Sequence, residues 1–77
     1  MKSVTILLDT IEKVRKFVNQ ISQYEGDFDI ISDRYIIDAK SIMGIFSLDL
    51  GKPLKLSIHS EEAVAKVLED FKEFIVE

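Results

Sequence analysis

Apolar residues recur along this 77-residue chain with two spacings, one typical of strands and the other typical of helices. In residues 54–58, Leu54, Leu56 and Ile58 alternate with polar neighbours, so a strand there has one apolar face. Three further segments carry comparable strand patterns: residues 4–8, 28–31 and 35–39. A sheet built from such strands needs helices over its apolar face and leaves its other face to water.

The first helical segment directly follows the first strand pattern. Its apolar residues are spaced three or four apart between Ile11 and Ile21, which predicts an amphipathic helix. Asp9 or Thr10 can cap the start of this helix, and Asp9 together with Glu12 has the spacing of a capping box.

The second half of the chain contains a short helical segment and a longer one. Ser41 is the expected N-cap of the short helix, which extends to about Leu48. The longer helix begins with the capping hydroxyl of Ser60, and its apolar stripe continues to Ile75.

The resulting order of elements is β-α-β-β-α-β-α. We therefore predict an α+β fold, an open-faced β-sandwich in which a four-stranded, mainly antiparallel sheet carries three helices on one face. A two-residue turn at Asp33 and Arg34 joins the two middle strands. Residues 1–77 are expected to form a single domain, because the chain is short and shows neither a linker nor an internal repeat.

The composition argues against several classes of function. The chain has no cysteine, which excludes disulfides and thiolate metal sites, and its net charge of −4 argues against direct binding of nucleic acid. Its apolar runs are too short to span a bilayer and no signal peptide is evident, so we expect a cytoplasmic protein that does not bind membranes. A single histidine without supporting ligands leads us to expect no metal and no cofactor.

One segment carries a specific motif, Lys40-Ser41-Ile42-Met43-Gly44 followed by a second serine at Ser47. It resembles the regulatory serine motif of the HPr family, the phosphocarrier proteins of the sugar phosphotransferase system. The likeness extends over almost the whole chain, and it implies the HPr-like form of the open-faced sandwich.

The same resemblance places Thr10 where HPr proteins carry their catalytic histidine, and Glu12 where they carry an arginine. A threonine hydroxyl cannot replace the nitrogen that forms a labile phosphoramidate, and a glutamate repels a phosphate. We therefore expect no catalytic residue, no phosphocarrier activity and no enzyme. His59 lies on the polar side of the last strand pattern, and we expect a solvent-facing histidine there rather than a substitute carrier.

Keeping the serine motif without the histidine is similar to the catabolite-repression HPr-like (Crh-like) proteins. This resemblance implies that Ser41 is phosphorylated by HPr kinase/phosphorylase and that the chain then binds a LacI-type transcription regulator. The expected partner-binding residues around the serine are Lys40, Ile42, Met43, Ile45 and Ser47.

Two alternatives to this regulatory role are left open by the sequence. One is residual phosphotransfer through His59 or Thr10. The other is an HPr-fold protein with an unrelated binding or structural role and no phosphorylation, in which Ser41 is only an N-cap. We expect Met43 and Phe46 to be exposed, where they would serve a protein partner or a homodimer equally well.

Overall fold

The computed structural model describes residues 2–76. Its four strands form one antiparallel sheet in the order β1-β4-β2-β3, so β1 and β3 are the edge strands. In β1, β2 and β4 the alternating apolar residues are buried, as the spacing predicted, whereas β3 has no buried residue. The strand bounds are β1 (Lys2–Ile6), β2 (Phe28–Ser32), β3 (Tyr35–Asp38) and β4 (Leu54–Ile58).

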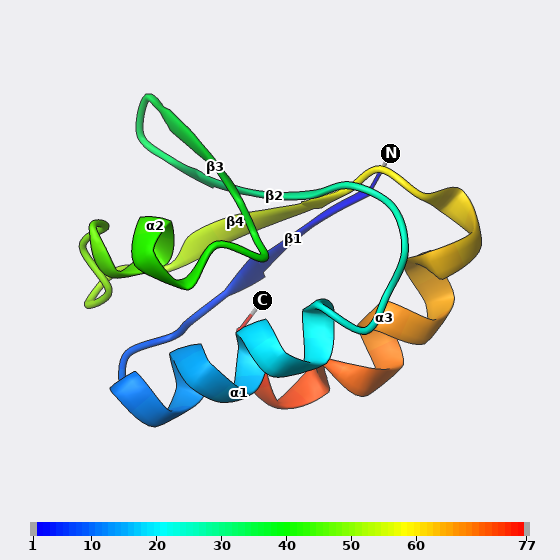
Figure 1. Ribbon diagram of the computed structural model, residues 1–77, viewed down its shortest axis with the longest axis horizontal. Helices are drawn as coiled ribbons and strands as arrows, with labels where there is room; N and C mark the ends of the chain where they lie inside the picture. Colours follow the sequence, from blue (N-terminus) through cyan, green and yellow to red (C-terminus); the bar gives the residue numbers. More distant parts are fainter. Residues whose placement is uncertain (1, 77) are drawn as a thin grey trace.

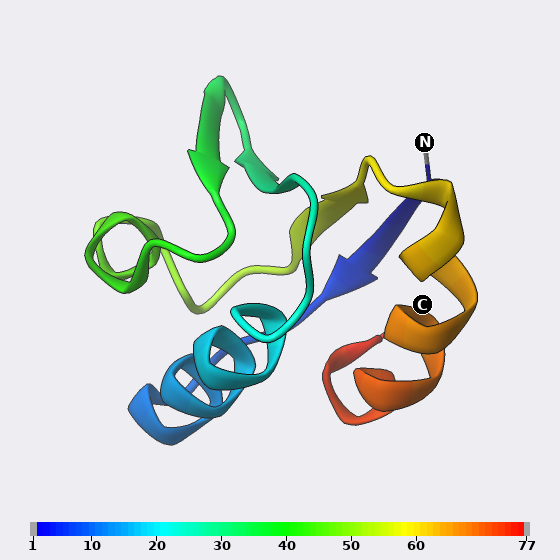
Figure 2. The ribbon, with the colours of Figure 1, turned by 45° about the vertical axis from the view of Figure 1, so that its right-hand side comes forward.

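Three α-helices accompany the sheet: α1 (Ile11–Ile21), α2 (Ile42–Phe46) and α3 (Val64–Asp70). Helices α1 and α3 lie on the same side of the sheet (Figures 1 and 2), and the short α2 packs against α1 and β3. The predicted α+β class, the order of elements and the four-stranded antiparallel sheet with its three helices are confirmed.

The ends of several predicted elements differ from the structure by one or two residues. The first strand pattern continues to Leu8, but β1 ends at Ile6 and Leu8 is buried in the loop that follows. Helix α2 ends at Phe46 rather than near Leu48, because the N–H of Ser47 bonds the Gly44 carbonyl three residues back and so tightens the final turn.

The last helical segment is not one continuous helix. Two 3₁₀ turns, η1 (Glu61–Ala63) and η2 (Lys72–Phe74), flank α3. The predicted capping hydroxyl is also wrong, since Ser60 makes no side-chain cap bond and the first turn is closed between backbone groups. The backbone leaves the helical region at Phe71 (φ −105°, ψ 17°), which separates α3 from η2.

The hairpin turn between β2 and β3 lies where it was predicted. Ser32 and Tyr35 are paired across it, which leaves Asp33 and Arg34 as the two loop residues. Asp33 has a φ of 52°, the left-handed conformation that tight hairpin turns require and that Asp tolerates better than most residues.

Aromatic rings fill the space between α1 and the C-terminal elements. The ring centroid of Phe17 lies 5.3 Å from that of Phe71 and 5.7 Å from that of Phe74, both in edge-to-face geometry. These three rings are almost completely buried, and such pairs add to the stabilisation that comes from burial alone. They fix α1 to the end of the chain.

Tyr24 joins the loop after α1 to α3. Its hydroxyl donates a hydrogen bond to the Asp70 carboxylate, and its ring packs edge-on against Phe28. Burial of the ring, and secondly the bond to the carboxylate, raise the pKa of Tyr24 to about 12.

We expect Tyr24→Phe to change how stability depends on pH in alkaline solution. The unfolded tyrosine has a pKa of 10.0 and the folded one about 12, so the unfolded chain loses its proton first. The stabilisation from this group is therefore complete below pH 10 and is lost as the pH rises towards 12. At neutral pH the variant should lose about 1–2 kcal/mol because the hydrogen bond is missing.

Urea unfolding of both proteins between neutral pH and pH 12, followed by circular dichroism, measures this difference. The gap in the free energy of unfolding should narrow through the alkaline window. A gap that stays constant would contradict the assignment, and Tyr35→Phe, at a largely exposed tyrosine, serves as the control.

Within residues 2–76, no helix combines the length and the apolar character needed to cross a bilayer.

Candidate functional site

Ser41 stands at the start of α2, where the sequence predicted an N-cap. Its backbone is extended (φ −95°, ψ 98°), and its Oγ accepts a hydrogen bond of 3.2 Å from the N–H of Gly44. Its carbonyl accepts the N–H of Ile45 at 3.0 Å, which begins the helical bonding. The side chain is exposed, so the hydroxyl caps the helix and also faces solvent.

Gly44 allows α2 to lie close to the sheet. A Cβ at this position would lie 2.6 Å from Cγ2 of Ile37 in β3 and 3.1 Å from Oγ of Ser41. The glycine of the motif is therefore required by packing, and it sets the distance between the serine and β3.

Lys40 is turned towards the body of the protein. Its ammonium donates to the carbonyl oxygens of Tyr24 at 2.6 Å and Gly26 at 3.3 Å, and it lies 5.5 Å from the centre of the Phe28 ring. The Lys40 ammonium therefore links the loop between α1 and β2 to the start of α2. Lys40 was predicted to lie on the partner-binding surface, and no local pattern indicated these bonds of its ammonium, which we call the Lys40 clamp.

The other predicted partner-binding residues divide into exposed and buried ones. Met43 is 77% exposed, Ser47 is exposed and Ile42 is half-buried. Ile45 is fully buried in the core, so its assignment to the surface around Ser41 is wrong: it lies on the face of α2 that packs inwards. Phe46 is 37% exposed, in agreement with the prediction that Met43 and Phe46 are accessible.

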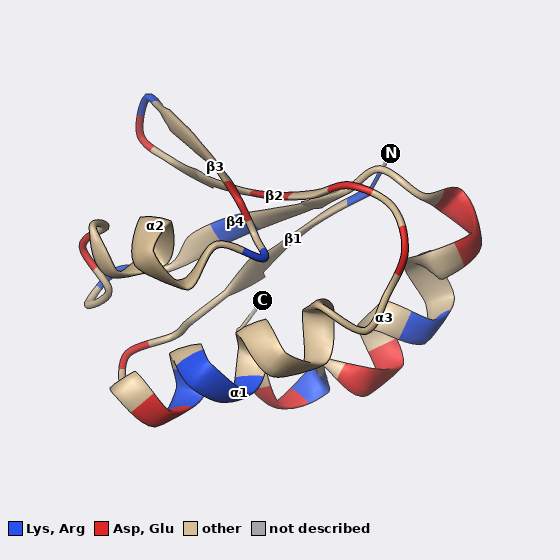
Figure 3. Ribbon diagram, viewed as in Figure 1, with Lys and Arg blue, Asp and Glu red and all other residues tan. Residues whose placement is uncertain are grey.

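The surface of α2 is free of charged side chains. Figure 3 shows the ribbon of α2 without Lys, Arg, Asp or Glu, whereas α1 carries several of them. Ser47, which follows the helix, is polar but uncharged, and its hydroxyl donates a hydrogen bond of 2.6 Å to the Gly44 carbonyl. A charge added at Ser41 would therefore stand alone on this helix.

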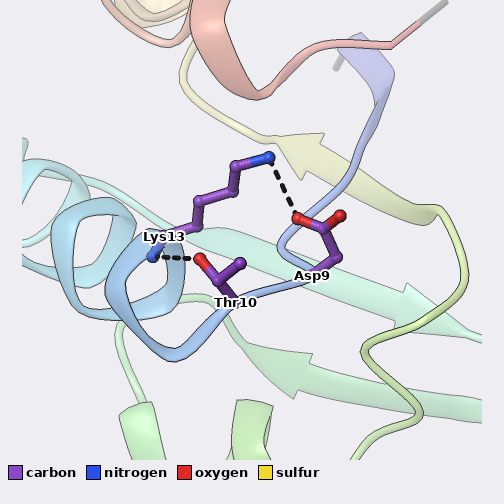
Figure 4. Close-up of polar contacts among 3 residues, drawn as sticks. All are labelled: Asp9, Thr10 and Lys13. Atoms are coloured by element: carbon purple, nitrogen blue, oxygen red, sulfur yellow. Dashed lines mark hydrogen bonds and ion pairs between the residues drawn. The ribbon is translucent and has the colours of Figure 1, made fainter.

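Thr10 forms the start of α1 (Figure 4). Its Oγ1 accepts the N–H of Lys13 at 3.1 Å, and Nζ of Lys13 reaches Oδ1 of Asp9 at 2.9 Å. The bond from Lys13 holds the pKa of Asp9 below its usual value. The predicted capping box of Asp9 with Glu12 is wrong, because the threonine itself supplies the cap and Asp9 pairs with Lys13.

His59 immediately follows β4, and both its ring and its backbone are bonded to neighbouring residues. Its ring atom Nε2 lies 2.8 Å from Oδ2 of Asp29 in β2, and its backbone N–H donates to the Asp27 carbonyl at 3.1 Å. The prediction of a solvent-facing histidine holds only in part, since the ring is 39% exposed but is paired. The sequence did not indicate Asp29, because that contact depends on β2 pairing with β4.

Acidic side chains surround this histidine. It lines a shallow hollow of about 280 Å³ together with Asp27, Asp29, Asp38 and Lys40. A phosphoryl group on His59 would meet several carboxylates there, with the one ammonium already bonded to carbonyl oxygens. In the part of the chain that the structure describes, no group of three or more His, Cys, Asp or Glu side chains is arranged to hold a metal ion.

Comparisons with known proteins agree with this architecture. The family model for PTS-HPr, the PTS HPr component phosphorylation site, matches residues 12–77, and its match thus begins just after Thr10. The crystal structure of HPr-C-His from Thermoanaerobacter tengcongensis aligns with a TM-score of 0.75 and 33% sequence identity, covering 95% of this chain and 92% of that chain. A search of curated protein sequences finds no match. The family match spans most of the chain and the structural likeness nearly all of it, and on both grounds the chain belongs to the HPr family.

Proposed function

We propose that this chain is a non-catalytic, regulatory member of the HPr family that receives a phosphate on Ser41 and acts by binding other proteins in carbon catabolite control. The observation that carries this proposal is the exposed hydroxyl of Ser41 at the start of α2, in a family member whose single histidine is paired with Asp29. HPr kinase/phosphorylase is the proposed source of the phosphate, and a LacI-type regulator is the proposed partner.

The environment of Ser41 suits phosphorylation. Its oxygen accepts the Gly44 N–H, and in the described residues the hydroxyl is recorded only as an acceptor, so its proton is available to a base on a kinase. The oxygen would attack the terminal phosphorus of ATP, with ADP leaving and the proton passing to that base. The phosphate on Ser41 is an anion, and an anion at the start of a helix is stabilised by about 0.3–1 kcal/mol, so we expect phosphorylation to cause little refolding.

The phosphate would act as a recognition signal. It adds a charge of about −1.5 to −2 to a helix without charged residues, beside the exposed side chain of Met43. A partner would combine a basic pocket for the phosphate with an apolar contact for Met43. With Ile45 buried and the Lys40 ammonium occupied, the proposed contact surface is reduced to Ser41, Ile42, Met43 and Ser47.

The site at the start of α1 gives no support to phosphocarrier activity. Thr10 supplies a hydroxyl that caps the helix, and Glu12 places an acid in the first turn. Among the nearby groups, Lys13 is paired with Asp9. These residues offer no imidazole to carry a labile phosphoryl group.

Intact-mass measurement after incubation with HPr kinase/phosphorylase and ATP tests the proposal. We expect the mass to rise by one phosphoryl group in the unmodified protein and not to rise in Ser41→Ala. Ser47→Ala is the matched control, because Ser47 is an exposed serine at the other end of the same helix, and it should still accept the phosphate.

Two outcomes would count against the proposal: no gain of mass, or a gain that persists in Ser41→Ala. Circular dichroism of Ser41→Ala excludes unfolding as the cause, since loss of the cap costs only about 1 kcal/mol. A second incubation with enzyme I and phosphoenolpyruvate addresses the carrier alternative. Phosphate uptake that is lost in His59→Ala or Thr10→Ala would favour that alternative instead.

A further inference from the structure

The two edges of the sheet are covered differently. On the β1 side, the C-terminal segment continues the pairing, with a bridge between Ile6 and Ile75 and a bond of 3.0 Å from the Val76 N–H to the Thr5 carbonyl. On the β3 side, the sheet order places no further strand beyond β3 within residues 2–76. The outer side of β3 is therefore an edge onto which another strand could add.

The register of the hairpin identifies which backbone groups face outwards. Ser32 and Tyr35 close the two-residue turn, so Tyr35 and Ile37 direct their N–H and C=O groups towards β2. The bond from the Ala39 N–H to the Phe28 carbonyl keeps the same alternation. Ile36, which lies between them, consequently directs its N–H and C=O away from the sheet.

The side chains on this edge are unusually apolar for an exposed strand. Tyr35 is 62% exposed and Ile36 is 69% exposed. Edge strands are usually protected by charges, by proline or by a covering segment, and exposed apolar residues on an edge favour pairing with another strand. Several large apolar side chains are exposed among the described residues, and Tyr35 and Ile36 are two of them that are neighbours in the sequence.

Charges of opposite sign flank this apolar pair. Arg34 precedes it, and no ion pair is recorded for Arg34 among residues 2–76. Asp38 follows it and lies directly across the strands from Asp29, a carboxylate of the same charge. Asp38 would therefore gain from a guanidinium on its outer side.

The β3 edge of one copy is complementary to the same edge of a second copy. When two copies of β3 are placed antiparallel with Ile36 opposite Ile36 of the second copy, Arg34 falls opposite Asp38 of the second copy. The two-fold axis repeats this pair, so two ion pairs flank the centre. In the same register each Ile36 exchanges both backbone hydrogen bonds with its counterpart.

We propose that the chain self-associates through this edge, with β3 of two copies pairing antiparallel about Ile36 to join the two sheets into one. The strand that pairs with β3 is a second copy rather than another peptide. In the antiparallel arrangement, the positive Arg34 of each copy meets the negative Asp38 of the other. The strand is four residues long, so the interface is small and the dimer is a weak, concentration-dependent one.

Sedimentation velocity over about a hundredfold range of protein concentration measures this association. We expect the weight-average mass to rise towards that of a dimer, and Ile36→Lys to raise the dissociation constant about tenfold or more, because two like charges then oppose each other. Ile11→Lys places the same charge on another exposed apolar residue, at the start of α1, and should leave the association unchanged.

A charge-exchange experiment tests the register itself. Arg34→Asp alone and Asp38→Arg alone each place like charges opposite one another in a homodimer, so both variants should remain monomeric. Mixed in equal amounts, they restore an opposite-charge pair at each flank and should form a heterodimer. Circular dichroism of each variant checks that it is folded.

Three results would overturn the proposal. The first is a protein that stays monomeric at every concentration. The second is a dimer that survives Ile36→Lys or is lost in Ile11→Lys, since either result would place the interface elsewhere. The third is a mixture of the two charge variants that shows no association beyond that of its components.

Discussion

Phe71→Ala is expected to lower the free energy of unfolding by about 3–5 kcal/mol. Phe71 is fully buried, and its ring centroid lies 5.3 Å from that of Phe17 and 5.9 Å from those of Tyr24 and Phe74. Truncation would remove the ring that links α1 to the C-terminal elements and leave a cavity between them.

Urea denaturation followed by circular dichroism measures this loss. Domains of this kind have total stabilities of about 5–15 kcal/mol, so Phe71→Ala is expected to lose a large share of its free energy of unfolding and to unfold at a much lower urea concentration. Phe46→Ala is the matched control, because Phe46 is 37% exposed and its loss should cost about 1 kcal/mol or less. Equal losses in the two variants would show that the rings at the C-terminus are not the centre of the core.

Part of this core could be predicted from local spacing. The helical pattern after Ser60 predicted a buried stripe of six residues. Three of them are buried (Val67, Phe71 and Phe74), and the other three are half-buried (Val64, Leu68 and Ile75). The same pattern predicted one helix, yet the backbone leaves the helical region at Phe71. Spacing records which residues face inwards, whereas the break depends on packing against α1, which is distant in the sequence.

The candidate site shows the same division between local and distant information. The cap at Ser41 and the exposure of Met43 follow from residues within one turn, and the sequence predicted both. The Lys40 clamp and the pairing of His59 with Asp29 join segments 14 to 30 residues apart, so no local pattern indicated them. Such contacts can be predicted only when the strand order is known.

The clamp changes what the serine motif is taken to mean. In the sequence, the lysine and the serine stand side by side and suggest one contact surface. In the structure, Lys40 faces the loop between α1 and β2, while Ser41 faces solvent. The lysine and the glycine of the motif therefore support the position of α2, and the serine with Met43 provides its exposed surface.

Gly44→Ala tests this structural role of the glycine, and we expect it to destabilise the protein by about 1–2 kcal/mol. The added methyl group would lie 2.6 Å from Cγ2 of Ile37 and 3.1 Å from Oγ of Ser41, closer than side chains can approach without moving. Overpacking of this kind costs about 1–3 kcal/mol. The better helix propensity of alanine returns up to about 1 kcal/mol, so the steric cost prevails.

Gly51→Ala is the matched control for this substitution. A Cβ at Gly51 would meet only Oδ1 of Asp49 at 3.4 Å, an ordinary contact, and its φ lies outside the left-handed region. We expect that variant to be unchanged or slightly more stable, since alanine restricts the unfolded chain. Urea unfolding of the two variants separates the effects. A Gly44→Ala protein at least as stable as the parent would mean that α2 can move away from β3 without cost, and the motif's glycine would then need a reason other than packing.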